Sequence, residues 1–378
     1  MKKVLRTILP AGFKANGVAC GLKRSAKPDL ALLYSDPAAL ACAKFTTNSI
    51  IAAPLIVSKK HLKSAGKIQA VLVNSGNANC FTGKAGINDA EASCSYLAAE
   101  LKIAKSSILV NSTGIIGKRL DIAKIKQGIP KLVSGLSLFG IQRAEKAIMT
   151  TDTFPKEVSV SLKIGGKIVR LCGIAKGAGM IAPDMATMLC FIMTDARITK
   201  QALNKSLSAA VDKSFNCISV DGCMSTNDTV LVLANGTAGN NIISKGKGLQ
   251  DFSEALGLVC LDLARMIVRD AEGATKFIQI DVCQADNFHE AKKIALNIAN
   301  SALFKSAVFG ENPNFGRVVA AVGASGFKIK ESQLKIKLGS LKEKQVKLTV
   351  SLSRGKASAT VYTSDLTPGY IKINAQYN

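Results

Sequence analysis

The chain of 378 residues contains no tryptophan, only five tyrosines and only two histidines. Proteins that bind single-stranded nucleic acid stack bases on aromatic side chains, so this scarcity argues against that class. His61 and His289 lie far apart in the sequence, and the ten cysteines form no Cys-x-x-Cys pair. Structural metal sites need ligands at such a spacing, so the sequence predicts no metal site.

Acidic residues are also scarce, because 26 Asp and Glu stand against 50 Lys and Arg, which gives a formal net charge of +24. Such a charge favours acidic partners such as nucleic acid. The basic residues are scattered through every segment, however, and over 327–350 they alternate with apolar residues. This alternation is typical of strands with one face in solvent. We interpret the charge as solvated faces and keep nucleic-acid binding as an alternative.

Long apolar runs are missing as well. No uncharged stretch reaches the length needed to span a bilayer. The amino-terminal segment has basic residues, but its apolar run is broken by Arg6 and ended by Pro10, which is too short for the core of a signal peptide. The cysteines of a long, core-rich chain are interpreted as small buried apolar residues in a reducing compartment. These features predict a cytoplasmic protein with no membrane association.

The order of the expected helices and strands predicts an α+β fold. Strand pairs and helices are mixed rather than strictly alternating, which favours α+β layers over a doubly wound parallel sheet. The expected elements are a strand at 68–73, a helix with apolar positions from 87 to 101, a strand at 108–111, a hairpin over 157–176 that turns at Gly165 and Gly166, a strand at 188–193, a helix around 202–211, short strands in "NCISVDG" and "TVLVLANG", a long helix over 252–270, a strand at 277–285, a helix at 288–302, and a carboxyl-terminal meander that ends in "YIKINAQYN".

One hydroxyl, that of Thr187, stands between a Gly-rich turn and an apolar run in "KGAGMIAPDMATMLCFIM". A threonine hydroxyl is a poor nucleophile unless a base lies beside it, and cleavage before it would supply its own α-amine as that base. Pro183 and Asp184 favour the tight turn that such a cleavage needs, and the small Ala186 leaves room for attack. A threonine at a strand start also has a purely structural explanation, and the residues alone leave both open.

A second hydroxyl lies in "NSTGIIG", residues 111–117. Thr113 Oγ and the Gly114 amide, on a loop that leaves a strand, could point to one place and form an oxyanion hole. A turn capped by its own side chains explains the same residues. The clusters "MTTDTFPK", "RDAEGATKF" and "ENPNFGR" have the same polar character, and each also fits a loop of caps and turns.

Taken in order, these clusters resemble the ornithine acetyltransferase family, the glutamate N-acetyltransferases of the arginine pathway. The resemblance runs from one end of the chain to the other. It rests on "GFKANGVACGLK", "VNSGNANCFTG", "NSTGIIG", "IMTTDTFPK", "AKGAGMIAPDMATMLCFIMTDA", "SVDGCMSTNDTVLVLANG", "IVRDAEGATKF", "GENPNFGRVVAAVG" and "YIKINAQY".

The resemblance implies a layered fold of the N-terminal-nucleophile type, with stacked β-sheets and flanking helices. It also implies self-cleavage between Ala186 and Thr187, which divides the chain into 1–186 and 187–378, and a heterotetramer of two such pairs. Thr187 would then be the nucleophile, and Thr113 with Gly114 the oxyanion hole. By the same resemblance the substrate would be contacted by Thr153, with Thr151 a second candidate beside it, and by Lys176, Thr187, Glu272 and Asn374.

The activity implied by the resemblance is acetyl transfer from N-acetylornithine to glutamate through an acetyl ester on Thr187, without a cofactor. Lys176 would bind a substrate carboxylate or favour the neutral amine of Thr187 by charge repulsion. The sequence leaves open whether acetyl-CoA also serves as a donor.

The sequence departs from the family pattern at several positions. Asn312 stands where the family has Asp, Cys223 and Met224 replace a more polar pair, and Ala178 stands where Ser is common. The family also carries a further hydroxyl residue after the position of Asn378. These departures bear on substrate affinity. Two alternatives remain: an amidase or aminopeptidase of the N-terminal-nucleophile type that uses water as acceptor, and a basic nucleic-acid-binding protein.

Overall fold

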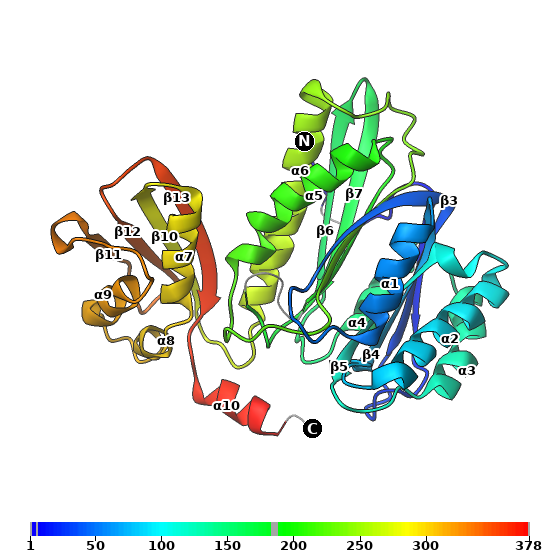
Figure 1. The fold of residues 1–378 in the computed structure, drawn as a ribbon, viewed down its shortest axis with the longest axis horizontal. Coiled ribbons are helices and arrows are strands. Elements are labelled where there is room, and N and C mark those ends of the chain that lie inside the picture. The colour runs from blue at the N-terminus through cyan, green and yellow to red at the C-terminus, as the bar shows by residue number, and fades with distance from the viewer. Residues whose placement is uncertain (1, 5–6, 183–187, 377–378) are drawn as a thin grey trace. The chain divides into compact units, whose positions relative to one another are not determined.

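The structure is a computed structural model that describes residues 2–4, 7–182 and 188–376 (Figure 1). The chain divides into two compact units. The first comprises Met1–Gly177, Thr187–Lys213 and Ser225–Leu263, and the second comprises Ala178–Ala186, Ser214–Met224 and Ala264–Asn378. The predicted fragments 1–186 and 187–378 differ from these units, because they are defined by the cleavage of one peptide bond and not by compactness. They stay a prediction, since the bond between them lies outside the described residues.

The first unit is built on a nine-stranded mixed sheet. Its strands are β1 (Lys2–Val4), β2 (Phe13–Val18), β3 (Leu30–Phe45), β4 (Ile68–Asn77), β5 (Ile108–Ile115), β6 (Lys156–Ile164), β7 (Lys167–Lys176), β8 (Leu189–Thr194) and β9 (Thr229–Ala234). They follow the order β1–β6–β7–β8–β9–β3–β4–β5, and β2 pairs with β3. The register of β3 shifts between Tyr34 and Ala39. Its first part pairs with β4 and its second part with β9, so β3 belongs to both halves of the sheet.

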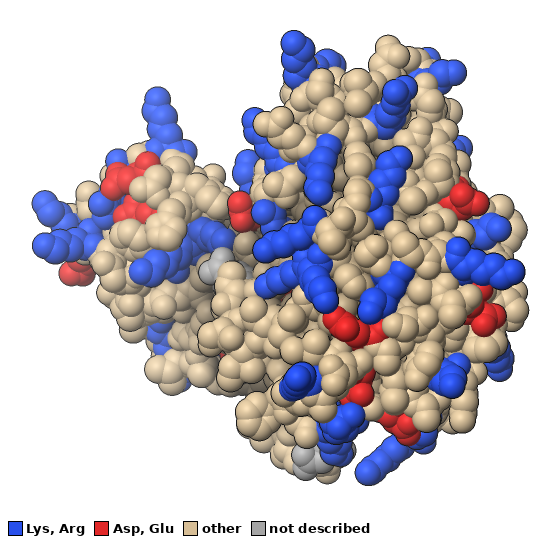
Figure 2. Space-filling model, turned by 45° about the vertical axis from the view of Figure 1, so that its right-hand side comes forward, with Lys and Arg blue, Asp and Glu red and all other residues tan. Residues whose placement is uncertain are grey.

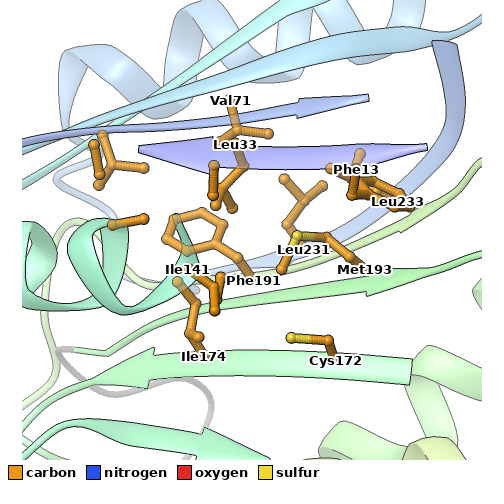
Figure 3. Packing of buried hydrophobic residues seen from close by; sticks show 14 of the residues in the cluster. Phe13, Leu33, Val71, Ile141, Cys172, Ile174, Phe191, Met193, Leu231 and Leu233 are labelled. Atoms are coloured by element: carbon orange, nitrogen blue, oxygen red, sulfur yellow. The ribbon is translucent and has the colours of Figure 1, made fainter. Parts of the chain in front are cut away.

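The two halves of this sheet pack face to face over a common core. Leu33 and Val71 point from one half toward Phe191, Met193 and Leu231 of the other half, as Figure 3 shows, and all are at most 1% exposed. Burial of such side chains is the main favourable term in folding. Strand alternation places the neighbours of Leu33 and Val71 on the opposite face of their half of the sheet.

Helices cover the outer faces of both halves. A second core cluster joins Leu72 of β4 to Val57, Cys94 and Ile129, which lie on α1 (Ala53–Ser64), α2 (Gly83–Leu101) and α3 (Ile122–Ser134). On the other half, α6 (Gly246–Arg269) approaches β7 so closely that a Cβ on Gly173 would meet Val259 and Leu263 within 2.9 Å. The remaining helices of this unit are α4 (Ile141–Ile148) and α5 (Lys200–Asp212). The predicted α+β layers with stacked sheets are confirmed.

The second unit contains a four-stranded sheet in the order β11–β12–β10–β13, on which α7 packs. Its elements are β10 (Phe277–Ala285), α7 (Phe288–Ala299), α8 (Ala302–Phe309), α9 (Phe315–Gly323), β11 (Lys335–Leu338), β12 (Gln345–Ser351), β13 (Ala357–Ser364) and α10 (Pro368–Ala375). The core consists of the inward side chains of β10, β12 and β13 against those of α7, α8 and α9.

Three predictions about local structure are wrong in this unit. Residues 370–375 of "YIKINAQYN" do not form a strand but belong to helix α10, which begins with Pro368 and is capped by the side chain of Thr367, an acceptor for the Tyr370 amide. The carboxyl-terminal strands do not form a meander, because β10 lies between β12 and β13 and pairs in parallel with β12. In "NCISVDG", Phe215–Cys217 forms a 3₁₀ helix, and Ile218 makes only an isolated bridge to Tyr362.

The charge distribution agrees with solvated basic faces. On the face shown in Figure 2, Lys and Arg side chains far outnumber acidic ones and are spread over the whole surface rather than gathered in one stripe. In the ranges that the structure describes, no helix has the length and apolar character to cross a bilayer.

Candidate active site

Thr113 and Gly114 lie near the end of β5, where this strand pairs in parallel with β4. Gly114 stands opposite Gly76, and its φ is +132°. A Cβ at position 114 would overlap the backbone of Gly76 and Asn77, so both the conformation and the close approach require glycine. Thr113 is 3% exposed. The predicted strand is confirmed, but Thr113 and Gly114 belong to the strand itself, where they pair with β4, and not to a loop that leaves it. This pairing holds the Thr113 backbone at a fixed, buried place.

Lys176, the last residue of β7, reaches the same place. It is 3% exposed, and its Nζ lies 3.4 Å from Oγ1 of Thr113 and 2.6 Å from Oγ1 of Thr150. Lysine is rarely buried to this extent without partners. The structure therefore brings together two residues that the sequence motifs singled out from segments 63 positions apart.

Asp152 is the acidic centre of this region, and its side chain is fully buried. It accepts hydrogen bonds from Lys156 Nζ at 2.7 Å, from the Gly177 amide at 2.7 Å and from the Thr150 amide at 2.9 Å, and Lys176 Nζ lies 3.9 Å away. Burial alone would raise the pKa of Asp152, but Lys176 and Lys156 together with the Gly177 amide hold it well below its usual range. The carboxyl group is therefore ionised at neutral pH.

Thr151 and Thr153 flank Asp152 in the same loop between α4 and β6. Thr153 is exposed and Thr151 is half-buried. The buried carboxylate thus fixes a short segment whose neighbouring hydroxyls are accessible, which suits a loop that contacts a small molecule.

Ala186 and Thr187 lie outside the described residues, so the structure does not test the predicted cleavage or the nucleophile. The first residue described after them is Met188, whose amide donates to Oδ1 of Asp228 at 2.9 Å. Asp228 is fully buried, and its Oδ2 has no hydrogen-bond partner among the described residues. Burial raises the pKa of Asp228 well above its usual value.

Asn227, the neighbour of Asp228, joins three segments of the first unit. Its Nδ2 donates to the carbonyl oxygens of Ala78 at 2.7 Å and Ser112 at 2.9 Å. It therefore anchors the start of β9 beside the residue that precedes Thr113. Neither Asn227 nor Asp228 was predicted from the sequence to have a role, although both lie in the "STND" stretch of one of the motifs.

In the second unit the structure brings together Glu272 and Asn374. Asn374 Nδ2 donates to Oε2 of Glu272 at 2.9 Å, and the Glu272 amide donates to the carbonyl of Ala178 at 3.0 Å. A Cβ on Gly179 would overlap the Glu272 carboxylate, so Gly179 leaves room for that group. Asn374 is exposed and Glu272 half-buried, so this carboxylate is accessible to a cationic ligand.

Most of the thiols are buried in the protein interior. All ten cysteines are free and seven of them are buried. Burial raises the pKa of Cys94 and of Cys172 to about 12, which keeps these thiols protonated and inert. Within the described part of the chain, no group of three or more His, Cys, Asp or Glu is placed to hold a metal ion.

The sequence profile of the ArgJ family matches residues 14–342 and 338–378. The arginine biosynthesis bifunctional protein ArgJ of Geobacter sulfurreducens is 43% identical over 388 residues, which cover 97% of this chain and 98% of the relative. The glutamate N-acetyltransferase of Methanocaldococcus jannaschii is 43% identical over 399 residues, 97% of both chains. These relatives match the chain over nearly its whole length, and their names place it in the class of acetyltransferases. The chain belongs to the ArgJ family, and the resemblance seen in the motifs is confirmed.

Among solved structures, the ornithine acetyltransferase of Mycobacterium tuberculosis, crystallised with ornithine, is 37% identical to this chain. The match covers 48% of this chain and 97% of that one, with a TM-score of 0.44.

Proposed function

We propose that the protein transfers an acetyl group from N-acetylornithine to glutamate, after cleaving itself between Ala186 and Thr187. The substrates come from the full-length relatives, which are named as ArgJ proteins and as a glutamate N-acetyltransferase. The observation that carries the chemistry is the buried Thr113 hydroxyl next to Gly114, with the Lys176 ammonium 3.4 Å away. Donors arranged in this way suit the negative oxygen of a tetrahedral acyl-transfer intermediate.

The first half of the reaction would acetylate Thr187. Its Oγ attacks the acetyl carbonyl carbon, its proton passes to its own α-amine, and the carbonyl electron pair moves to an oxygen bound by Thr113 Oγ–H and the Gly114 amide. When the carbonyl re-forms, the bond to the ornithine nitrogen breaks and that nitrogen takes the proton. Ornithine leaves, and an acetyl ester remains on Thr187.

The second half would run in the opposite direction with a different amine. The neutral α-amine of glutamate attacks the ester carbonyl and gives a proton to the α-amine of Thr187, while the same donors bind the oxygen. When the carbonyl re-forms, the bond to Thr187 Oγ breaks, that oxygen takes the proton, and N-acetylglutamate leaves. This is a ping-pong mechanism, because the first product departs before the second substrate reacts. We assign Thr153 and Lys176 to substrate contact in the first unit, and Glu272 with Asn374 to contact with the ornithine ammonium in the second.

Two further features of the proposal concern assembly and location. We propose that fragments 1–186 and 187–378 stay associated in a heterotetramer of two pairs, and that the enzyme acts in the cytoplasm. The word "bifunctional" in the names of several relatives makes acetyl-CoA the obvious second donor to test.

The experiment measures ornithine release from N-acetylornithine by purified protein with and without glutamate. The proposal expects one fast turnover per site without glutamate, continuous turnover with it, and parallel lines in double-reciprocal plots. Steady release of ornithine and acetate without glutamate would instead identify an amidase that uses water. Replacing N-acetylornithine with acetyl-CoA in the same assay tests the second donor.

A further inference from the structure

In the hydrogen bond between Lys176 and Thr113, the lysine is the donor and the threonine is the acceptor. A lysine ammonium can only donate hydrogen bonds, whereas a threonine hydroxyl has one hydrogen to donate and lone pairs to accept. At 3.4 Å the Thr113 oxygen is therefore the acceptor, and its own hydrogen must point elsewhere. No described residue accepts that hydrogen. The Thr113 O–H is thus kept available for an oxygen that arrives with the substrate.

Lys176 is held in this position by Thr150 and Asp152. Thr150 Oγ1 accepts from Nζ at 2.6 Å, a shorter contact than the 3.4 Å to Thr113. Asp152 accepts from the amide of Thr150 at 2.9 Å and from the amide of Gly177, directly after Lys176, at 2.7 Å. The carboxylate of Asp152 therefore fixes the backbone of Thr150, whose hydroxyl contacts the ammonium, and the backbone directly after Lys176. It also supplies a negative charge 3.9 Å from the ammonium.

From this geometry we propose that Thr150 and Asp152 are positioning residues that hold Lys176 against Thr113, so that the Thr113 hydroxyl is aimed as an oxyanion donor. The inference rests on the proposed acetyl transfer and deepens it. It gives Lys176 a part in the oxyanion site itself rather than in substrate binding alone. Hydrogen bonds in such a chain strengthen one another, because each donor polarises the next.

The surroundings of the ammonium are mainly basic. Lys156 donates to Asp152 at 2.7 Å, and Lys23 and buried Asp228 also interact electrostatically with Lys176. The ionised Asp152 balances the charge of only one of its two lysine partners, Lys156 and Lys176, so one positive charge is in excess in this buried region. A negative charge that develops on the substrate oxygen would be stabilised there more strongly than in water.

The test is a double-mutant cycle of Thr150→Val and Thr113→Val. Thr150→Val removes the acceptor that lies 2.6 Å from Lys176 Nζ with little change in shape, and we expect it to slow acetylation of the enzyme about 10- to 100-fold. KM for N-acetylornithine should stay within about twofold, since the loss appears only in the transition state. In a Thr113→Val background the same substitution should have almost no further effect, because Thr150 would act through Thr113.

The variants are compared per working site, by dividing each rate by the amplitude of the ornithine burst, so that incomplete self-cleavage does not distort the result. Thr194→Val is the matched control: it removes another buried hydroxyl of the first unit, one that donates to the Arg170 carbonyl at 2.7 Å. It should leave the rate per site unchanged. Thr150→Ser, which keeps the acceptor, should restore most of the rate, and Asp152→Asn should lower it.

Three results would overturn the inference. One is an unchanged acetylation rate in Thr150→Val. Another is a raised KM with an unchanged kcat, which would limit Lys176 to substrate binding. The third is an equal slowing in both backgrounds, which would show that Thr150 does not act through Thr113. These results differ from a failure of the proposed function itself. In that case the unmodified protein would transfer no acetyl group, whereas the three results above require an active unmodified protein.

Discussion

The amide of Met188 donates a hydrogen bond to Oδ1 of Asp228 at 2.9 Å, and Asp228 is fully buried at the start of β9. Met188 follows Thr187 in the chain and precedes β8, so this bond fixes the backbone where the strand of the proposed nucleophile begins. β8 and β9 are parallel neighbours, which keeps Asp228 level with Met188.

Removing the carboxyl group of Asp228 should therefore destabilise the protein. In Asp228→Ala the buried Met188 amide loses its acceptor, and we expect the free energy of unfolding to fall by about 1–3 kcal/mol. Asp228→Asn should cost much less, since its amide oxygen can still accept from the Met188 amide and burial, which raises the pKa of Asp228 well above its usual value, favours an uncharged group here. Urea unfolding of both variants provides the comparison. An Asn variant as unstable as the Ala variant would contradict this account.

The two proposed fragments should remain together after cleavage. β8 and β9, which follow position 187, lie between β7 and β3, which precede it, and are hydrogen-bonded to both. Separation would expose two strand edges and the shared core of Phe191 and Leu231. Gel filtration in native buffer should give one peak that contains both fragments, at the elution volume of uncut Thr187→Ala. Separate peaks without denaturant would refute this prediction.

Glu272 should determine affinity for the amine substrate. Glu272→Gln removes a carboxylate that can pair with an ammonium, and we expect KM for N-acetylornithine to rise about 10-fold, the equivalent of about 1.4 kcal/mol. Gly179→Ala should act in the same direction, because its Cβ would displace the Glu272 carboxylate.

Gly257→Ala provides the matched control for that glycine substitution. It adds the same methyl group to a helical position with no atom within 4 Å of the new Cβ, so kinetics should be unchanged. If Glu272→Gln and Gly179→Ala kept the original KM as well, Glu272 would have no part in substrate binding.

Glu145 should make the protein less stable as the pH rises. Burial, followed by the nearby charge of Glu157, raises the pKa of Glu145 to about 8 from an ordinary value of 4.5. The folded state therefore keeps a proton that the unfolded chain releases above about pH 4.5, and this carboxyl lowers the free energy of unfolding progressively between pH 4.5 and 8.

Glu145→Gln should remove this effect and stabilise the protein by about 1–3 kcal/mol at pH 8, with little change at pH 4.5. Urea unfolding across this pH range measures the difference, with exposed Glu331→Gln as the control for loss of a carboxylate. A constant difference between the Glu145 variant and the unmodified protein at every pH would be inconsistent with the assignment.

Local patterns predicted local structure well. The hairpin that turns at Gly165 and Gly166, the strand at β8 and the helix after it follow from alternation, helical spacing and turn residues within a short window. The same holds for Thr113 and Gly114 at the end of a strand. These features depend on neighbours in the sequence, so the sequence alone specifies them.

Long-range relationships were not predicted. The placement of β10 between β12 and β13 depends on a parallel pairing of strands about 70 residues apart, which no local pattern records. Asp228 and Asn227 were missed for a similar reason, since their partners Met188, Ala78 and Ser112 lie in segments far away in the sequence. The Thr367 cap of α10 was a local signal, and it was outweighed by the alternation in "YIKIN".

The central claim is that Thr187 becomes an amino-terminal residue and carries the acetyl group. It is tested most directly by the intact mass of the purified protein after incubation with N-acetylornithine and no glutamate. The account predicts two fragments, 1–186 and 187–378, of which only the second gains the mass of one acetyl group and loses it when glutamate is added. Thr187→Ala should remain a single unmodified chain. A single uncut wild-type chain, or two fragments without an acetyl group on the second, would contradict the account.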